Sequence, residues 1–183
     1  RSSDVPMRRE SLTALTRYTV RAAAMYENSA AGVLGVLNEA LLRQRQDFRF
    51  TTLVCGLLDF HDDRFVLRVA SGGHPMPLLL RADGHAEVIV AHGALLGVLP
   101  DATFEEVEVV LERGDTVVLY TDGLTDAGAP DRITSEADLL AELERGAGLS
   151  AVEVIARLED LAVGADEAAP RDDIAIAALR LSD

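Results

Sequence analysis

Residues 114–127, GDTVVLYTDGLTDA, join an apolar segment to an acidic turn. Apolar and β-branched residues fill positions 116–119, a composition that predicts a buried strand. This strand delivers Asp122 and Gly123 into a turn, and a second carboxylate follows at Asp126. The strand would fix the carboxylate, and glycine would let the backbone approach closely. An Asp-Gly pair alone is most often an ordinary turn, but this context favours a site for a hard cation.

A second acidic segment lies near the end of the chain. Arg171, Asp172 and Asp173 lead directly into the strand-like residues 174–177, IAIA. These residues could be only the polar start of a strand, with Arg171 pairing a carboxylate at the surface, and such pairs contribute little. Two acidic sites at strand ends, this one and the turn at Asp122, nevertheless predict a shared metal centre. Carboxylates suit Mg²⁺ or Mn²⁺, and no set of His and Cys suited to zinc is present.

Composition limits the class of protein. The 183 residues are 49% hydrophobic and 26% charged, which predicts a single globular domain over 1–183 with a real core. A net charge of −14 argues against nucleic acid as a partner, and no apolar run is long enough to predict a membrane span. The single cysteine, Cys55, lies in an apolar segment and is expected in the core. One cysteine excludes an internal disulfide and favours a reducing, cytoplasmic location.

Helix signals occur at both ends of the chain. Residues 1–10 include Pro6 and show no periodicity, so we expect an irregular entry before an amphipathic helix over 12–25. Ser29 would open a second helix. Two capping boxes, Ser135 with Asp138 and Ser150 with Glu153, predict helices over 136–145 and 151–163. The segment 164–170 is expected to be a loop.

Strand signals fill the middle and return at the end. Short links between successive strands predict antiparallel hairpins, because parallel neighbours need long crossovers. Helices, a block of strands, further helices and a returning strand together predict an α+β fold. The expected strands are 51–60, 64–71, 77–82, 86–91, 104–112, 116–121 and 174–181.

Four blocks in this order resemble a known family. The blocks are SGGHPMPLLLR (71–81), GALLGVLPD (93–101), GDTVVLYTDGLTDA (114–127) and PRDDIAIAALR (170–180). They resemble the successive motifs of metal-dependent protein phosphatases of the PPM (type 2C) family, in the bacterial SpoIIE/RsbU-like branch. The resemblance covers residues 11–183. Any single block would be weak evidence, but the ordered set of four is specific.

The resemblance implies a fold and a chemistry. The fold would be an antiparallel β-sandwich flanked by helices, in four αββα layers. Two Mn²⁺ or Mg²⁺ ions would activate water for attack on phosphoserine or phosphothreonine. By motif, Asp122 and Asp172 would be the catalytic metal ligands, and Gly123 would give backbone access. Asp173 would support the site without binding metal.

Two further residues, His74 and Asp126, could each have either of two roles. His74 follows a Gly-Gly pair and would either orient a loop beside the site or approach the phosphate. Asp126 would either support the metals or start the loop before Pro130.

The front of the chain departs from the family pattern. The family opens with a motif of the type Gly-Asp-Val-x-Gly-Lys-Gly, whose aspartate binds metal. Here Asp4 and Val5 are followed by PMRR at residues 6–9, so Asp4 is only a candidate third ligand. The preceding strands and loop could be omitted from this sequence, the chain could be truncated, or the ligand could be lost. We favour omitted residues, since a sheet without its edge strands would expose an apolar face.

The resemblance also implies partners. The expected substrate is a phosphorylated anti-sigma-factor antagonist, a small STAS domain, in sigma-factor regulation under stress. A sensor domain or an anti-sigma kinase domain could be linked to the same polypeptide. The alternative, motivated by the incomplete first motif, is a non-catalytic phosphatase-like module that binds a partner or senses ions.

Overall fold

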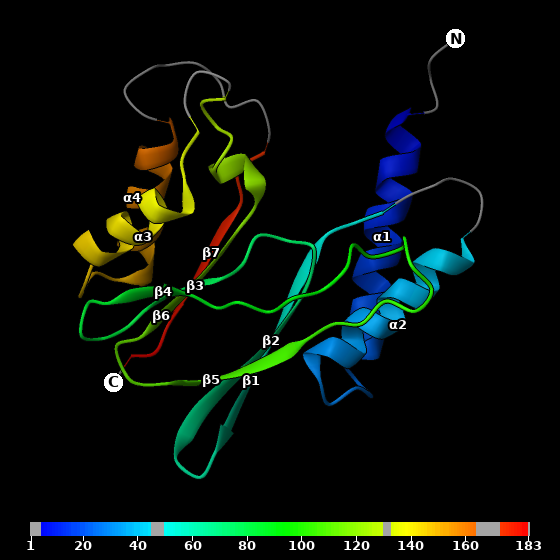
Figure 1. The fold of residues 1–183 in the computed structure, drawn as a ribbon, viewed down its shortest axis with the longest axis horizontal. Helices are drawn as coiled ribbons and strands as arrows, with labels where there is room; N and C mark the ends of the chain where they lie inside the picture. The colour runs from blue at the N-terminus through cyan, green and yellow to red at the C-terminus, as the bar shows by residue number, and fades with distance from the viewer. Residues whose placement is uncertain (1–4, 45–49, 130–132, 164–172, 183) are drawn as a thin grey trace. The chain divides into compact units, whose positions relative to one another are not determined.

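A computed structural model of the chain describes residues 5–44, 50–129, 133–163 and 173–182 (Figure 1). Four α-helices, seven strands and one short 3-10 helix are assigned within these ranges. In chain order they are α1 (Val5–Ala23), α2 (Ala30–Arg43), β1 (Leu53–His61), β2 (Arg64–Gly72), β3 (Leu78–Leu80), β4 (Ala86–Val88), β5 (Glu106–Leu111), β6 (Thr116–Tyr120), η1 (Asp122–Leu124), α3 (Glu136–Arg145), α4 (Ala151–Val163) and β7 (Ile176–Arg180).

The chain divides into two compact units that interleave along the sequence. The first contains residues up to Leu57, with Arg68–His74 and Ala91–Glu108. The second contains Leu58–Leu67, Pro75–Val90 and the chain from Val109 onward. A single domain over 1–183 therefore stays a prediction.

The strands form two sheets, and the α+β class is confirmed. One sheet has the order β1-β2-β5, and the other has the order β4-β3-β6-β7. In the second sheet β3 pairs antiparallel with β4 and with β6, so that Leu79 lies opposite both Glu87 and Val117. On its other side β6 pairs antiparallel with β7, from Thr116 opposite Arg180 to Tyr120 opposite Ile176. β6 is thus held on both edges.

The expectation that short links make hairpins is wrong at two places. It holds between β1 and β2, where Asp62 and Asp63 adopt the positive φ angles of 49° and 59° that tight hairpin turns use. However, residues 73–77 and 112–115 each connect strands that belong to different sheets. Both links contain a glycine with positive φ, Gly73 at 72° and Gly114 at 96°. Such a turn redirects the chain as readily into a second sheet as back along the first.

The start of α1 also differs from the prediction. The sequence pattern predicts an irregular segment over 1–10 and a helix over 12–25, whereas α1 begins at Val5 and ends at Ala23. Pro6 does not exclude a helix here, because in the first turn its missing N–H would have no intrahelical partner.

The helices after the sheet have the predicted bounds, 136–145 and 151–163. Ser135 Oγ accepts from the Asp138 amide at 3.2 Å while Asp138 Oδ2 accepts from the Ser135 amide at 3.0 Å. The apolar faces of α3 and α4 pack on the β4-β3-β6-β7 sheet (Figure 1). No helix in the described ranges carries an apolar stretch of the length that a bilayer crossing requires. The buried residues of this core are Leu78, Leu80, Ala86, Val118, Tyr120, Leu124, Leu139, Leu143, Val154, Leu158 and Ala162.

A smaller core lies in the first unit. Leu34, Leu37 and Leu41 of α2 pack with Ala70 and Leu96, and all five are buried. Cys55 packs against this cluster but is only half-buried. Cys55, expected in the core, therefore lies at the edge of this cluster, where burial and the neighbouring Glu106 carboxylate raise the pKa of its thiol.

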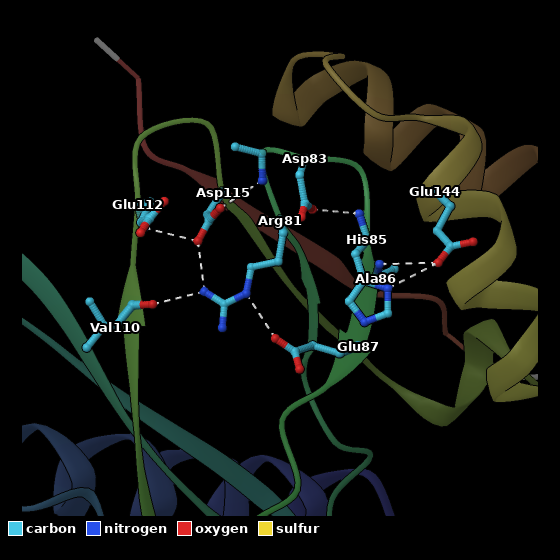
Figure 2. Close-up of polar contacts among 10 residues, drawn as sticks. Arg81, Asp83, His85, Ala86, Glu87, Val110, Glu112, Asp115 and Glu144 are labelled. Atoms are coloured by element: carbon cyan, nitrogen blue, oxygen red, sulfur yellow. Dashed lines mark hydrogen bonds and ion pairs between the residues drawn. The ribbon is translucent and has the colours of Figure 1, made fainter.

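A buried carboxylate organises the start of β6 (Figure 2). Asp115, with 2% of its side chain exposed, accepts a hydrogen bond from Arg81 Nη1 at 3.0 Å. It also accepts from the amides of Ala82 at 2.9 Å and Glu112 at 3.0 Å. Arg81 donates in addition to Glu87 at 2.9 Å. The Asp115 carboxylate therefore ties the ends of three strands, β3, β5 and β6, to one point.

We predict that Asp115→Ala lowers the free energy of unfolding by about 3 kcal/mol, because it removes the acceptor of three donors at a buried position. Glu87→Gln is the matched control, because Glu87 pairs with the same arginine but is 43% exposed. Its loss should stay below about 1 kcal/mol. Urea unfolding of both variants measures the difference, and equal losses would contradict the assigned role of Asp115.

The α3–α4 pair contains a pH-sensitive ion cluster. Glu142 accepts from Arg145 Nη1 at 2.7 Å and from Arg157 Nη2. Desolvation opposes ionisation of Glu142, but these two arginines outweigh it and lower the pKa of the carboxyl group. A lowered pKa in the folded state means stability that is present above the unfolded pKa and lost as the pH falls through the folded pKa.

We expect Glu142→Gln to be less stable than the parent at about pH 7, with the difference in stability narrowing as the pH falls through the lowered pKa of Glu142 and the parent carboxylate is protonated. Glu159→Gln, on the exposed face of α4, serves as the control and should change the free energy of unfolding by less than about 0.5 kcal/mol. Urea unfolding at a series of pH values gives the measurement. If the difference in stability between the parent and Glu142→Gln widened at low pH, the lowered pKa of Glu142 would be contradicted.

Candidate metal centre

The candidate site begins where β6 leaves the sheet. Thr121 continues the extended backbone at φ −94° and ψ 159°, and the chain then turns through η1. Leu124, the last residue of η1, is fully buried in the core that α4 covers. Asp122, the first residue of η1, is exposed. The sequence thus anchors the turn by an apolar residue and leaves the carboxylate at the surface.

Hydrogen bonds within the turn fix the backbone of Asp122. Its carbonyl oxygen accepts from Thr125 Oγ1 at 2.9 Å and from the Asp126 amide at 2.9 Å. The Thr125 carbonyl in turn accepts from the amide of the buried Thr134 at 2.9 Å. Within the described ranges, the Asp122 carboxylate itself makes no hydrogen bond or ion pair. Because Asp122 is exposed, a cation from solvent can reach it.

The two acidic segments meet at Gly123. A Cβ atom at this position would lie 2.4 Å from the Asp173 carbonyl oxygen and 3.3 Å from the Ile174 nitrogen. Only glycine permits this approach, so Gly123 is needed for space rather than for an unusual φ angle. Thr121 adds hydrogen bonds between the same two segments, to Asp173 and Ala175. The backbone thereby places the Asp122 turn directly beside the entry to β7.

The arrangement fits a hard divalent cation in part. The turn that carries the exposed Asp122 carboxylate lies against the backbone of a second acidic segment, so closely that a Cβ at position 123 would collide with it. Oxygen donors of this kind suit Mg²⁺ and Mn²⁺. Asp172 and Asp4 lie outside the described residues, and the described part of the chain contains no group of three His, Cys, Asp or Glu that could hold a metal. Of the predicted site residues, the structure thus brings together Asp122, Gly123 and Asp173.

His74 holds a loop in the first unit. Its ring Nδ1 lies 3.0 Å from Thr52 Oγ1, and its backbone exchanges hydrogen bonds with the buried Ser71 hydroxyl at 3.1 and 3.2 Å. Of the two roles considered for His74, these contacts favour the one in which it orients a loop.

Asp126 lies on the same turn as Asp122, and its side chain is exposed. Its carbonyl accepts from the Ala129 amide at 3.0 Å, which begins the loop toward residue 130. This contact supports the role of Asp126 in starting the loop, while its role in supporting the metals stays a prediction.

Two residues with structural roles at the two ends of β6 do not stand out in the sequence. The pattern places Asp115 in an ordinary turn, although an aspartate at a turn often bonds nearby amides, as its contact with Glu112 shows. The sequence pattern predicts Thr121 only as the last residue of a strand. Its partners are more than fifty positions away in the sequence, so no local signal could identify them.

We predict that Gly123→Ala lowers the free energy of unfolding by about 2 kcal/mol, because its Cβ would collide with the Asp173 carbonyl. Gly35→Ala in α2 is the control, since nothing lies within 4 Å of a Cβ there and alanine favours the helix by up to about 1 kcal/mol. Thermal or urea unfolding compares the two. A neutral Gly123→Ala would contradict the close approach.

Sequence comparisons identify the family of the chain. A family model described as Stage II sporulation protein E (SpoIIE) matches residues 9–182. Phosphoserine phosphatase RsbU of Bacillus subtilis (strain 168) is 26% identical over 123 residues, which cover 67% of this chain and 37% of RsbU. The chain spans well under half of the length of the curated relatives that it matches.

Structure comparisons give the same fold. The RsbU and RsbW domains of Rv1364c from Mycobacterium tuberculosis superpose with a TM-score of 0.73 at 25% identity, covering 94% of this chain and 47% of that one. RsbX, solved in complex with magnesium, superposes with a TM-score of 0.63 at 17% identity, covering 94% and 73%. Since the family model matches nearly the whole sequence, the chain belongs to the SpoIIE family of PPM-type phosphatase domains, in the RsbU/SpoIIE-like branch, with two antiparallel sheets flanked by helices.

Proposed function

We propose that this protein is a Mn²⁺- or Mg²⁺-dependent phosphatase of phosphoserine or phosphothreonine in proteins, with Asp122 and Asp172 as its catalytic metal ligands. The observation that carries the proposal is the backbone contact between Gly123 and Asp173. It sets two acidic segments from distant parts of the sequence side by side. Family membership and the magnesium in RsbX support the choice of metal.

Each residue has a distinct part in this proposal. The Asp122 carboxylate, exposed on a turn fixed by its own carbonyl, binds a cation from one side. Asp172 binds from the neighbouring segment, and Asp4 is a third candidate ligand. Gly123 keeps the segments close, and the Asp173 backbone packs against it. When bound, paired cations supply an activated water and neutralise phosphoryl oxygens.

The proposed substrate is a phosphorylated STAS-type anti-sigma-factor antagonist. The motif resemblance to the SpoIIE/RsbU-like branch implies this substrate, and the relative RsbU carries the name phosphoserine phosphatase. The Mycobacterium relative carries RsbU and RsbW domains, which supports a linked sensor or anti-sigma kinase domain as a further partner. An exposed site on a short turn suits a protein substrate, because a folded domain can reach it.

A second candidate is a non-catalytic module of the same fold. The observation that favours it is the helical backbone of residues 5–9, which contain no glycine and occupy the place of the family's first metal motif. Such a module would bind a partner without hydrolysing phosphate. Metal binding separates the two proposals, because a catalytic site requires a cation held through Asp122.

We predict that Asp122→Asn and Asp172→Asn each lower phosphate release from a phosphorylated STAS domain by about a hundredfold or more in the presence of Mn²⁺, because each loses an anionic ligand. Asp160→Asn, on the exposed face of α4, is the control and should retain activity. Calorimetric titration with Mn²⁺ should show binding that depends on Asp122. Mn²⁺ binding without turnover would favour the second candidate, and full activity in both site variants would refute the first.

A further inference from the structure

We infer that Thr121 is a positioning residue for the metal site, whose hydroxyl group sets the distance between the Asp122 turn and the segment that enters β7. This inference rests on the proposed function and extends it to a residue that would not touch the metal. Four observations support it. The Thr121 hydroxyl bonds to the neighbouring segment, and the residue lies between β6 and the turn. Thr121 and Gly123 both contact the Asp173 carbonyl, and a different threonine, Thr125, fixes the turn itself.

The Thr121 hydroxyl group bonds to the neighbouring segment as both donor and acceptor. Its oxygen donates to the Asp173 carbonyl at 3.2 Å and accepts from the Ala175 amide at 3.0 Å. The Thr121 amide donates to the Ala175 carbonyl at 3.0 Å. Through its amide and its hydroxyl, Thr121 therefore holds a segment more than fifty positions away in the sequence.

These bonds continue the β6–β7 pairing past its last register pair. That pair is Tyr120 with Ile176, directly before Thr121 on one strand and directly after Ala175 on the other. Beyond it, the side chain of Thr121 takes the place of a backbone partner. The hydroxyl therefore controls where the two chains separate, and the two acidic segments lie immediately beyond that point.

Both chain neighbours of Asp122 rest on the same carbonyl group. Thr121, before it, donates to the Asp173 oxygen, and Gly123, after it, packs so closely on that oxygen that a Cβ would lie 2.4 Å away. The Cα of Asp122 is consequently held at a fixed place relative to Asp173. Loss of the hydroxyl removes one of the two supports while the glycine contact remains.

Thr125 has a separate task. It bonds to the Asp122 carbonyl from within the turn, and its own carbonyl accepts from Thr134. Thr125 therefore shapes the turn, whereas Thr121 attaches the turn to the second segment. A cation shared by two segments depends on that attachment, because groups behind the ligands orient them and tune the affinity.

The test compares Thr121→Val and Thr121→Ser with Thr116→Val in the otherwise unchanged protein, by calorimetric titration with Mn²⁺ and by the Mn²⁺ electron paramagnetic resonance spectrum. Thr116 is a matched control, because it lies on the same strand and its hydroxyl accepts from Arg180 of β7 at 3.1 Å, at the far end from the site. Melting temperatures, measured without metal, show how much each change affects folding alone.

We expect Thr121→Val to weaken Mn²⁺ binding about tenfold or more, the range found for residues that support metal ligands. Thr121→Ser should restore binding to within about twofold, since serine keeps the hydroxyl group. Thr116→Val should also stay within about twofold of the parent, although its melting temperature falls, because its hydroxyl is remote from the ligands. Equal affinities for the two valine variants would overturn the inference while leaving the proposed function intact. If the parent protein bound no Mn²⁺, or bound it without dependence on Asp122, both would be overturned.

Discussion

The approach of Gly123 to the Asp173 carbonyl is the constraint on which the site depends. Two acidic segments separated by about fifty positions can share a cation only if their backbones lie close enough for side chains from both to reach it, and the Gly123 contact brings the two backbones together. A side chain at position 123 would collide with the Asp173 carbonyl and push the two segments apart. The close approach also explains why glycine follows the aspartate although its backbone does not need a positive φ angle. Its requirement is steric.

β6 holds the Asp122 turn in place, because the strand is fixed at its start, along its length and just after its end. At its start, the buried Asp115 carboxylate gathers donors from the end of β3 and from the β5–β6 link. Along its length the strand is paired on both edges, and after its end Leu124 is buried among residues of the sheet and α4. The exposed Asp122 side chain therefore stands on a backbone that has little freedom to move. A metal ligand needs such a support, because precise spacing of the ligands comes from packing behind them.

Local signals predict some parts of this structure well and others not at all. The helices over 136–145 and 151–163 are predicted to the residue, because each capping box marks a start and the apolar period marks the length. The apolar run before Asp122 likewise predicts β6. Periodicity does not show which strands share a sheet. The prediction of hairpins at 73–77 and 112–115 is therefore wrong, because each link joins strands of different sheets. The start of α1 is not predicted, because Pro6 is compatible both with a loop and with the first turn of a helix. Of the candidate site, motifs identify the Asp-Gly turn and its neighbour at Asp173, but the Thr121 contacts depend on tertiary pairing.

Exposure of Asp122 follows from what the site would have to do. A buried carboxylate without a partner is costly, and burying several like charges together would cost still more. On a surface turn, water can solvate the Asp122 carboxylate when no cation is bound, so the proposed site would not require its metal in order for the turn to form. The apolar anchor of the turn is Leu124, two positions after the carboxylate, which separates the anchoring of the turn from its chemistry. The same surface position would leave room for the proposed protein substrate to approach. Thr121 and Thr125, on either side of Asp122, would then hold the exposed ligand in place through their hydrogen bonds.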